Sequence, residues 1–271
     1  MSDRVQPTPE QRADWERRFK SVKWTLLPNP KLAPRAQNAM DEVILDEMAA
    51  GRRGPHIRFW NWNANAVIIG RFQSVKNEVH EDAAREGGVT ISRRMTGGGA
   101  MLIEPQNAIT YTIAAPEELV KGMNFAESYQ FFDSWVLDSL RELGVDAWYV
   151  PLNDITSSNG KIGGAAQARK KGIALHHTTS AYDMTDGALT RILRIGKEKL
   201  SDKGVTSAER RVAPLRQQTE LDRDVIINHM IGYFRGQYGL EDDTFRPEEL
   251  ERLDELVTTK YDTDEWVYSL P

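Results

Sequence analysis

The chain has 271 residues, of which 35 are Lys or Arg and 40 are Asp or Glu, and it contains no cysteine. This length predicts one large domain with room for an ample hydrophobic core. The net charge of −5 disfavours a protein dedicated to nucleic acid or anionic membranes, since such proteins carry a dense basic face. The absence of cysteine excludes disulfides, cysteine-ligated zinc or iron–sulfur clusters, and a thiol nucleophile.

The sequence gives no indication of a membrane segment. Its first twenty residues are charged and lack the apolar stretch of a signal peptide. No apolar run approaches the ~20 residues that are needed to cross a bilayer. We therefore expect a soluble, cytoplasmic protein.

The first half of the chain alternates helix and strand patterns. Thr8-Pro9-Glu10-Gln11 forms a capping box with proline at the first helical position, which predicts a short helix in an N-terminal extension, residues 1–21. The main domain is expected over 22–271. Apolar residues four apart predict a helix over 34–50. The other patterns predict strands at 22–27, 57–62, 66–72 and 89–92, and a short helix at 81–86.

The middle of the chain contains strand patterns and one strong helix pattern. Alternating β-branched and aromatic residues at 100–103 and 108–114 indicate two strands that pair with each other. Asn124, with Glu127 three residues later, predicts a helix start. An apolar stripe along that helix predicts core packing and comprises Phe125, Tyr129, Phe132, Val136, Leu140 and Leu143.

The last part of the chain is mainly helical. Strand patterns at 147–150 and 173–184 precede helical patterns at 221–234 and 247–257, and the polar stretch 196–220 is interpreted as a long functional loop. Strands gather in the first two thirds, while helices are interspersed or terminal. The sequence therefore predicts an α+β fold with a mixed, mostly antiparallel sheet flanked by helices.

A glycine-rich string, RRMTGGGA at 93–100, lies between two predicted strands. Three successive glycines allow a close backbone approach and direct several N–H groups at one ligand, which suits a phosphate. Arg93 and Arg94 supply charge-assisted donors for the same anion. The string has neither the Walker nor the GxGxxG spacing. A glycine-rich hairpin with solvated arginines remains an equally good interpretation of the local features.

A second string, GKIGGAAQ at 160–167, sets Lys161 among small residues, where its ammonium suits a carbonyl or phosphate oxygen. A surface lysine in a turn is the alternative. Asp154, shortly before it, is a candidate Mg²⁺ ligand, although a lone aspartate is more often a loop cap.

Two adjacent histidines, His176 and His177, lie on a predicted strand. Adjacent strand residues point to opposite faces, so the pair cannot chelate one metal ion. We expect one of them to act as a hydrogen-bonding residue at the site. A basic, glycine-containing loop follows at 199–205, where an ordinary solvated loop is an equally good interpretation.

Taken together and in this order, six strings resemble those of the lipoate–protein ligase family, which shares a superfamily with the biotin ligases. They are GRFQSVKNEV at 70–79, RRMTGGGA at 93–100, ND at 153–154, GKIGGAAQ at 160–167, HHTT at 176–179 and KLSDKGVTSAERRV at 199–212. The resemblance covers most of the chain from about residue 22 onward. It implies a biotin/lipoate ligase-type catalytic domain over 22–271.

The resemblance also implies a two-step reaction. Lipoate and ATP form lipoyl-AMP, and the lipoyl group then passes to a lysine on a lipoyl domain of a 2-oxoacid dehydrogenase acyltransferase subunit or on a glycine-cleavage H-protein. By matching motifs, Lys161 is the catalytic residue, Asp154 is a candidate Mg²⁺ ligand, and His177 lies in the pocket. The implied nucleotide and substrate contacts are Arg71, Arg94, Gly97, Gly98, Gly99, Ala100, Met101, Leu102, Asn107 and Lys161. From the strand pattern, Trp60, Val67 and Ile69 are expected to line the apolar end of the pocket.

Two features depart from the family pattern. Many members carry His-Asp after the glycine string, where this chain has Ile103-Glu104. Full-length ligases also carry a further C-terminal domain, which implies that a separate accessory subunit completes the reaction here or that none is needed. Two alternatives remain: an octanoyl or lipoyl transferase of the same fold, whose usual cysteine thioester is unavailable to this chain, and a lipoyl-domain-binding module without catalysis.

Overall fold

The computed structural model describes residues 4–194 and 212–270. The helices are α1 (Pro9–Lys20), α2 (Pro34–Ala49), α3 (Val75–Glu78), α4 (Glu81–Glu86), α5 (Phe125–Glu142), α6 (Ala188–Ile192), α9 (Arg223–Tyr238), α10 (Pro247–Leu256) and α11 (Asp264–Val267). The strands are β1 (Thr25–Leu27), β2 (Lys31–Leu32), β3 (His56–Phe59), β4 (Asn61–Trp62), β5 (Ala66–Ile69), β6 (Thr90–Arg93), β7 (Met101–Ile103), β8 (Ala108–Pro116), β9 (Trp148–Val150), β10 (Asp154–Ser157), β11 (Gly160–Lys170), β12 (Ile173–Ala181) and β13 (Glu241–Asp242). None of these described helices is long and apolar enough to span a membrane.

The strands of the described residues form one large sheet and two small ones. The large sheet has eight strands in the order β13-β1-β3-β8-β12-β11-β10-β9, and the small sheets are β6-β5-β7 and β2-β4. From β3 to β9 the large sheet is antiparallel, whereas β1 runs parallel to both of its neighbours. The α+β class with a mixed, mostly antiparallel sheet is therefore confirmed.

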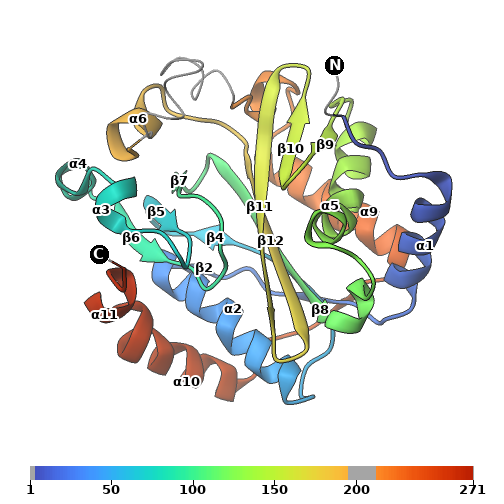
Figure 1. The fold of residues 1–271 in the computed structure, drawn as a ribbon, viewed down its shortest axis with the longest axis horizontal. Coiled ribbons are helices and arrows are strands. Elements are labelled where there is room, and N and C mark those ends of the chain that lie inside the picture. The colour runs from blue at the N-terminus through green and yellow to red at the C-terminus, as the bar shows by residue number, and fades with distance from the viewer. Residues whose placement is uncertain (1–3, 195–211, 271) are drawn as a thin grey trace.

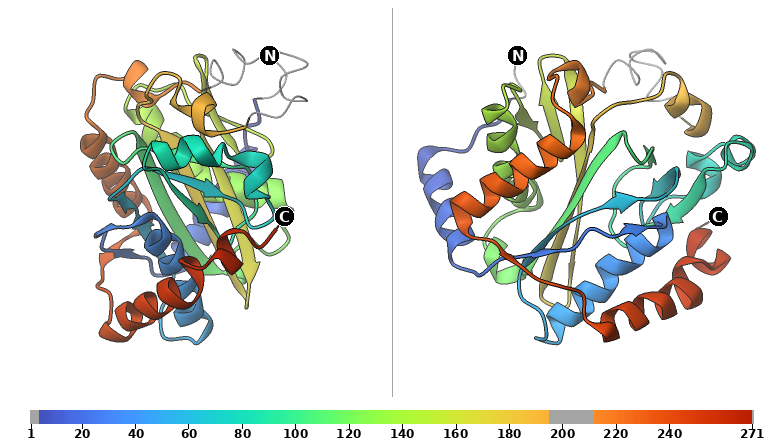
Figure 2. Two further views of the ribbon diagram at one scale, coloured as in Figure 1. Left: turned by 90° about the vertical axis from the view of Figure 1, so that its left-hand side faces the viewer. Right: turned by 180° about the vertical axis from the view of Figure 1, so that it is seen from behind.

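Helices cover the large sheet on both sides (Figure 1). On one side α1, α5 and α9 pack over it, and on the other side lie α2, the β6-β5-β7 sheet and the C-terminal helices α10 and α11 (Figures 1 and 2). The main core lies beneath α5 and α9, where Trp135 and Phe234 meet edge to face with ring centroids 5.2 Å apart. The small sheet and α2 therefore meet the large sheet on the side away from this core.

Helix ends fall where the capping patterns predicted them. Thr8 and Asn124 each accept a hydrogen bond from the backbone of the third helical residue, and Gln11 and Glu127 complete the two capping boxes. The predicted stripe along α5 is buried or partly buried except at Phe125, whose exposure is 57%. Phe125 lies in the first turn, where its ring contacts the Arg169 guanidinium instead of the core.

The predicted pairing of 100–103 with 108–114 is wrong. β7 pairs with β5 in the three-stranded sheet, whereas β8 lies between β3 and β12 in the large sheet. Between them the chain passes from one sheet to the other, through a turn in which the Asn107 amide donates to the Glu104 carbonyl. β8 is buried along nearly its whole length, which is typical of a central strand that needs two neighbours.

The long hairpin of β11 and β12 determines the register at the centre of the large sheet. Lys170 pairs with Ile173 across a two-residue turn of Lys171 and Gly172, both with positive φ (56° and 76°). Such turns match the right-handed twist of the strands that they join. The register then continues without a shift to Gly163 and Ser180.

Helix α1 packs on the main core through Trp15 and Phe19. Phe19 is fully buried, and its ring stacks on that of Phe131 with centroids 4.4 Å apart. The helix that the sequence places in an N-terminal extension thus contributes to the same hydrophobic cluster as α5 and α9.

We predict that Phe19→Ala lowers the free energy of unfolding by about 3–5 kcal/mol, because it removes a buried aromatic ring from a packed cluster. Denaturant unfolding of the full chain measures this, with Glu16→Ala on the solvent face of α1 as the control. A loss below 1 kcal/mol for Phe19→Ala would show that α1 is only loosely attached.

Candidate functional site

The glycine-rich string forms a loop between β6 and β7 that lies against the turn following β5. The predicted strand over 66–72 ends at Ile69, because Gly70 starts this turn. An ideal Cβ on Gly70 would lie 2.1 Å from the Gly98 carbonyl oxygen, so only glycine allows this approach. The Arg71 amide donates to the Thr96 carbonyl at 2.8 Å. The two backbone segments therefore form one unit.

The Arg94 side chain holds the glycine loop in shape. It is buried and donates to the carbonyls of Gly97 (2.6 Å) and Gly99 (2.9 Å), and to the Thr96 hydroxyl (3.1 Å). Gly98, between these acceptors, has φ of +89°, which favours glycine. Burial lowers the pKa of Arg94 to about 10, so the guanidinium stays charged at neutral pH.

Arg93 ties the turn after β5 to the end of the chain. Its guanidinium donates to the carbonyls of Gly70, Arg71, Gln73, Trp266 and Val267. Burial and the nearby charge of Arg71 lower the pKa of Arg93. Arg71 itself donates to the Ser269 hydroxyl at 3.2 Å and lies over the Trp266 ring.

Among the residues described, none of these three guanidiniums has a carboxylate within 4.0 Å; their hydrogen-bond partners are carbonyl and hydroxyl oxygens. Carbonyls satisfy the N–H groups but carry no net charge. The glycine loop is thus surrounded by three positive charges without a counter-ion from residues 4–194 or 212–270. Such an arrangement suits a bound anion with several oxygens, such as a phosphate chain.

Lys161 lies near the start of β11, where one extra residue is inserted in the pairing with β10. Gly163 and Lys161 face consecutive residues of β10, so Ile162 is left over as a β-bulge. Ile162 is buried in the core beneath α5. The bulge shifts the alternation of side chains for the residues that precede it.

This shift directs Lys161 toward the glycine loop. Its Nζ lies 3.2 Å from the position of an ideal Cβ on Gly164, so the two positions share a face of the strand. Ala166 is on the same face by alternation, and its Cβ lies 3.6 Å from an ideal Cβ on Gly98. Lys161 Nζ also forms an ion pair of 2.7 Å with Asp154 Oδ1. Lys161, Asp154 and the glycine loop therefore lie along one face of β11.

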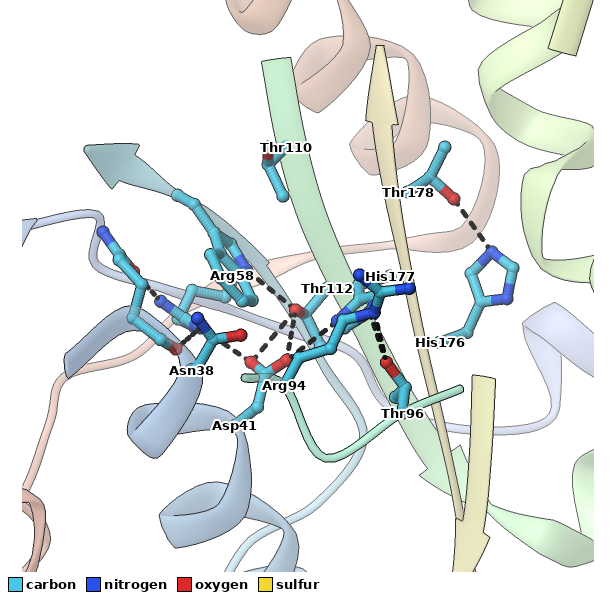
Figure 3. Close-up of polar contacts among 12 residues, drawn as sticks. Asn38, Asp41, Arg58, Arg94, Thr96, Thr110, Thr112, His176, His177 and Thr178 are labelled. Atoms are coloured by element: carbon cyan, nitrogen blue, oxygen red, sulfur yellow. Dashed lines mark hydrogen bonds and ion pairs between the residues drawn. The ribbon is translucent and has the colours of Figure 1, made fainter. Parts of the chain in front are cut away.

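A network of buried hydrogen bonds connects the glycine loop to β12 and α2 (Figure 3). His177 Nε2 lies 2.8 Å from the Thr96 hydroxyl, and His177 Nδ1 lies 3.2 Å from Asp41 Oδ2. Asp41, on α2, also binds Arg58 at 2.7 Å and Thr112 at 3.0 Å. Burial raises the pKa of Asp41, but the Arg58 charge and the His177 hydrogen bond outweigh it, so the net shift is downward.

The roles of Asp41, Arg58 and Thr96 were not predicted from the sequence. A polar residue in an amphipathic helix is normally assigned to solvent, yet Gln37, Asn38 and Asp41 are all buried. Their positions i, i+1 and i+4 on α2 form one polar strip within an otherwise apolar face. This polar strip is the sequence pattern that could have indicated a buried polar site on α2.

The two histidines of β12 point to opposite faces, as predicted. His176 lies on the α5 side, where its Nε2 is 2.9 Å from Asp133 Oδ1, while His177 faces the glycine loop (Figure 3). Among the described residues, no group of three or more His, Cys, Asp or Glu could hold a metal ion by itself.

The other predicted site residues fall in several places. Gly97, Gly99 and Ala100 belong to the glycine loop, and Met101 and Leu102 begin β7. Asn107 lies at the turn before β8, where its amide side chain donates to Glu104 and its carbonyl accepts from Tyr182. Asn107 is thus hydrogen-bonded within the turn before β8 and not to the glycine loop. Most of the string at 199–212 lies outside the described residues.

The expected apolar end of the pocket is not assembled from Trp60, Val67 and Ile69 together. Alternation along β5 places Val67 and Ile69 in a cluster with Val75, whereas Trp60 packs with Ile68 in another. Trp60 is the one that borders the site, since its ring meets the His177 ring edge to face at 5.8 Å.

Comparison with known proteins identifies the family. The family model of the Lipoyl protein ligase A/B catalytic domain matches residues 33–235, and the chain belongs to this family. It is 30% identical to the lipoate-protein ligase A subunit 1 of Thermoplasma acidophilum over 86% of this chain and 91% of that protein. It is also 26% identical to the octanoyltransferase LipM of Anoxybacillus flavithermus, over 90% of this chain and 97% of that one.

Solved structures agree with this assignment. One is the archaeal lipoylation system of Thermoplasma acidophilum, described as a bi-partite lipoate protein ligase and its E2 lipoyl domain; the TM-score is 0.80 at 28% identity, covering 92% of this chain and 98% of that chain. Another is a lipoate-protein ligase A bound with ATP, with a TM-score of 0.77 at 27% identity, covering 92% and 100%. The chain is thus an enzyme of the lipoate ligase and octanoyltransferase family.

We predict that Gly70→Ala disrupts the glycine loop, because the added Cβ cannot lie 2.1 Å from a carbonyl oxygen and the two segments must separate. The expected loss of stability is about 2 kcal/mol or more, measured by denaturant unfolding. Gly99→Ala is the matched control, since a Cβ there has no heavy atom within 4 Å and should change stability by less than about 1 kcal/mol. Equal losses for the two variants would contradict the close contact.

The buried histidines near Asp41 predict a pH dependence of stability. Burial lowers the pKa of His177, and it lowers the pKa of His56 to about 3. His56 therefore stays neutral in the folded protein, whereas the same side chain in the unfolded chain takes up a proton below about pH 6.5, so the free energy of unfolding falls as the pH falls from 6.5 toward 3. The lowered pKa of His177 acts in the same direction. We expect His56→Gln to reduce the slope by up to ~1.4 kcal/mol per pH unit, measured by denaturant unfolding between pH 7.5 and 4.5. A variant with the wild-type slope would show that His56 titrates normally.

Proposed function

We propose that the protein is an ATP-dependent lipoate–protein ligase that forms lipoyl-AMP and transfers the lipoyl group to a lysine of an acceptor protein. One observation carries this proposal. Arg71, Arg93 and Arg94 surround a glycine loop without a described carboxylate partner, and Lys161 shares the strand face that contacts this loop. The site therefore suits a polyphosphate beside a carboxylate.

The proposed chemistry joins two anions. A carboxylate oxygen of lipoate attacks the α-phosphorus of ATP, a new C(O)O–P bond forms, and the bond to the β-phosphate breaks to release pyrophosphate. Positive charge and backbone donors must offset the repulsion as the two anions meet. Lys161 would bridge the carboxylate and the α-phosphate, while Arg71, Arg94 and the N–H groups of the glycine loop would bind the phosphates. The acceptor lysine then attacks the acyl carbon and AMP leaves.

The nucleotide and Mg²⁺ are part of the proposal. ATP is supported by the ATP-bound ligase structure to which this chain is similar. Asp154 supplies one carboxylate next to Lys161, which fits a Mg²⁺ ion that keeps most of its contacts with phosphates and water. Bound there, Mg²⁺ would neutralise phosphate charge.

The acceptor would be a lipoyl domain of a 2-oxoacid dehydrogenase acyltransferase subunit or a glycine-cleavage H-protein, in the cytoplasm. This follows the Thermoplasma structure, which pairs a bi-partite ligase with an E2 lipoyl domain. A bi-partite relative also supports a separate accessory subunit as a partner of this chain. A requirement for that subunit is one of the outcomes that the first assay distinguishes.

An octanoyltransferase is the second candidate, favoured by the similarity to LipM proteins along 90% of the chain. Acyl transfer through a thioester requires a thiol on the enzyme, and this sequence has no cysteine. Lys161 forms an ion pair with the Asp154 carboxylate, and no contact among the described residues joins this pair to a hydroxyl side chain that could act as the nucleophile. The ligase reaction needs no covalent enzyme intermediate, so we prefer it.

The assay that tests the proposal is the intact mass of an apo lipoyl domain after incubation with this protein, lipoate and Mg-ATP. A parallel reaction contains an octanoyl carrier protein without ATP. We expect a lipoyl adduct only in the ATP reaction. An adduct only in the carrier reaction would overturn the ligase proposal. Pyrophosphate release without an adduct would indicate a required accessory subunit, and neither product would favour a binding module.

We predict that Lys161→Ala reduces pyrophosphate release on the order of 10²–10³-fold, because it removes the cation between two reacting anions. Binding of the acceptor domain should persist in this variant. Lys170→Ala, at the far end of the same strand, is the matched control and should release pyrophosphate at the wild-type rate. Full activity in Lys161→Ala would exclude the proposed role.

A further inference from the structure

The C-terminal segment of the chain contacts the site, although it lies beyond residues 33–235, which the family model matches. It comprises α10, a π-helical turn (Val257–Tyr261) and α11, and it lies beside α2 and β6 (Figures 1 and 2). Helix α11 reaches the Arg93 side chain with the carbonyls of its last two residues, Trp266 and Val267. The segment therefore supports the turn that carries Arg71.

Arg71 has an unusual set of contacts for a charged residue beside an anion-binding loop. Its Cζ lies 4.6 Å from the centroid of the Trp266 ring, and its Nη1 donates to the Ser269 hydroxyl. The cationic side chain of Arg93 lies nearby, since its guanidinium donates to the Arg71 carbonyl at 3.1 Å. Repulsion from the Arg93 guanidinium tends to push the Arg71 guanidinium away, so an attractive contact is needed to keep Arg71 in one position.

The Trp266 ring is itself held firmly. Its Nε1 donates to the Arg93 carbonyl at 2.9 Å, and its ring centroid lies 5.4 Å from that of Tyr261. Lys260 Nζ lies 4.1 Å from the Trp266 centroid. A ring fixed by three neighbours can serve as a rigid support for the Arg71 side chain.

We propose that Trp266 is a positioning residue that holds the Arg71 guanidinium beside the glycine loop, ready for a phosphate group. A ring face attracts the cation without neutralising it, and it leaves N–H groups of the fork free for an incoming anion. A carboxylate in the same place would hold Arg71 but would compete with the phosphate. The inference rests on the proposed function, because its ligand is the nucleotide.

The test is a double-mutant cycle on Mg-ATP binding to the full chain, measured by calorimetry. We expect Trp266→Leu to weaken binding about three- to ten-fold, which is the range of one cation–π contact. Arg71→Ala should weaken it at least as much, and the double variant should bind like Arg71→Ala alone, because Trp266 acts through Arg71. Trp266→Phe keeps a ring face and should bind within about two-fold of wild type. Steady-state assays should show a raised KM for ATP with kcat and the KM for lipoate nearly unchanged.

Val267→Ala is the control for loosening of α11. This side chain packs in the cluster around Val67, whereas the Arg71 guanidinium contacts Trp266 and Ser269, so the variant should lower the melting temperature but not ATP affinity. Equal weakening by Val267→Ala, additive losses in the cycle, or no rescue by Trp266→Phe would each overturn the positioning role. A wild-type chain that binds no Mg-ATP would overturn both this inference and the proposed function. Wild-type binding with additive losses would overturn this inference alone.

Discussion

Within the described part of the chain, carbonyl oxygens rather than carboxylates surround the arginines of the glycine loop. A carbonyl fixes the direction of a guanidinium through hydrogen bonds but leaves its charge in place. Arg94 shapes the loop in this way, and Arg93 joins the turn after β5 to the end of α11. The backbones of Gly70 and Gly98 lie too close for any side chain between them. The hydrogen bonds of Arg93 to Gly70 and of Arg94 to Gly97 and Gly99 hold the two segments in these positions. The positive charge that remains is the basis of the proposed binding of phosphate groups.

Features set by neighbouring residues in the sequence were predictable. The capping boxes at Thr8 and Asn124 are local hydrogen-bond patterns, and both formed where expected. The opposite directions of His176 and His177 also follow from strand geometry alone. The glycine string was a candidate because successive glycines allow a close backbone approach to a ligand, and Lys161 was a candidate because it lies among small residues.

Features that depend on distant partners were not predictable. The pairing of β7 with β5 rather than β8 is set by which sheet each strand joins, and nearby sequence contains no signal for it. The direction of Lys161 depends on a bulge opposite β10, which the sequence pattern does not reveal. The sequence pattern of α2 does not reveal that Asp41 is buried, because its partners Arg58 and His177 come from β3 and β12. In each case the deciding contact lies far away in the chain.

The two-residue turn between β11 and β12 has a consequence for how the site tolerates change. A slip of β12 by one residue would turn its alternating side chains to the opposite faces, so that His176 would leave Asp133 and His177 would leave Thr96. The turn of Lys171 and Gly172 sets the register at one end of the hairpin, and these buried hydrogen bonds require the same register further along it. A substitution that strains this exposed turn would therefore act on the site through the register of β12, although neither Lys171 nor Gly172 belongs to the site.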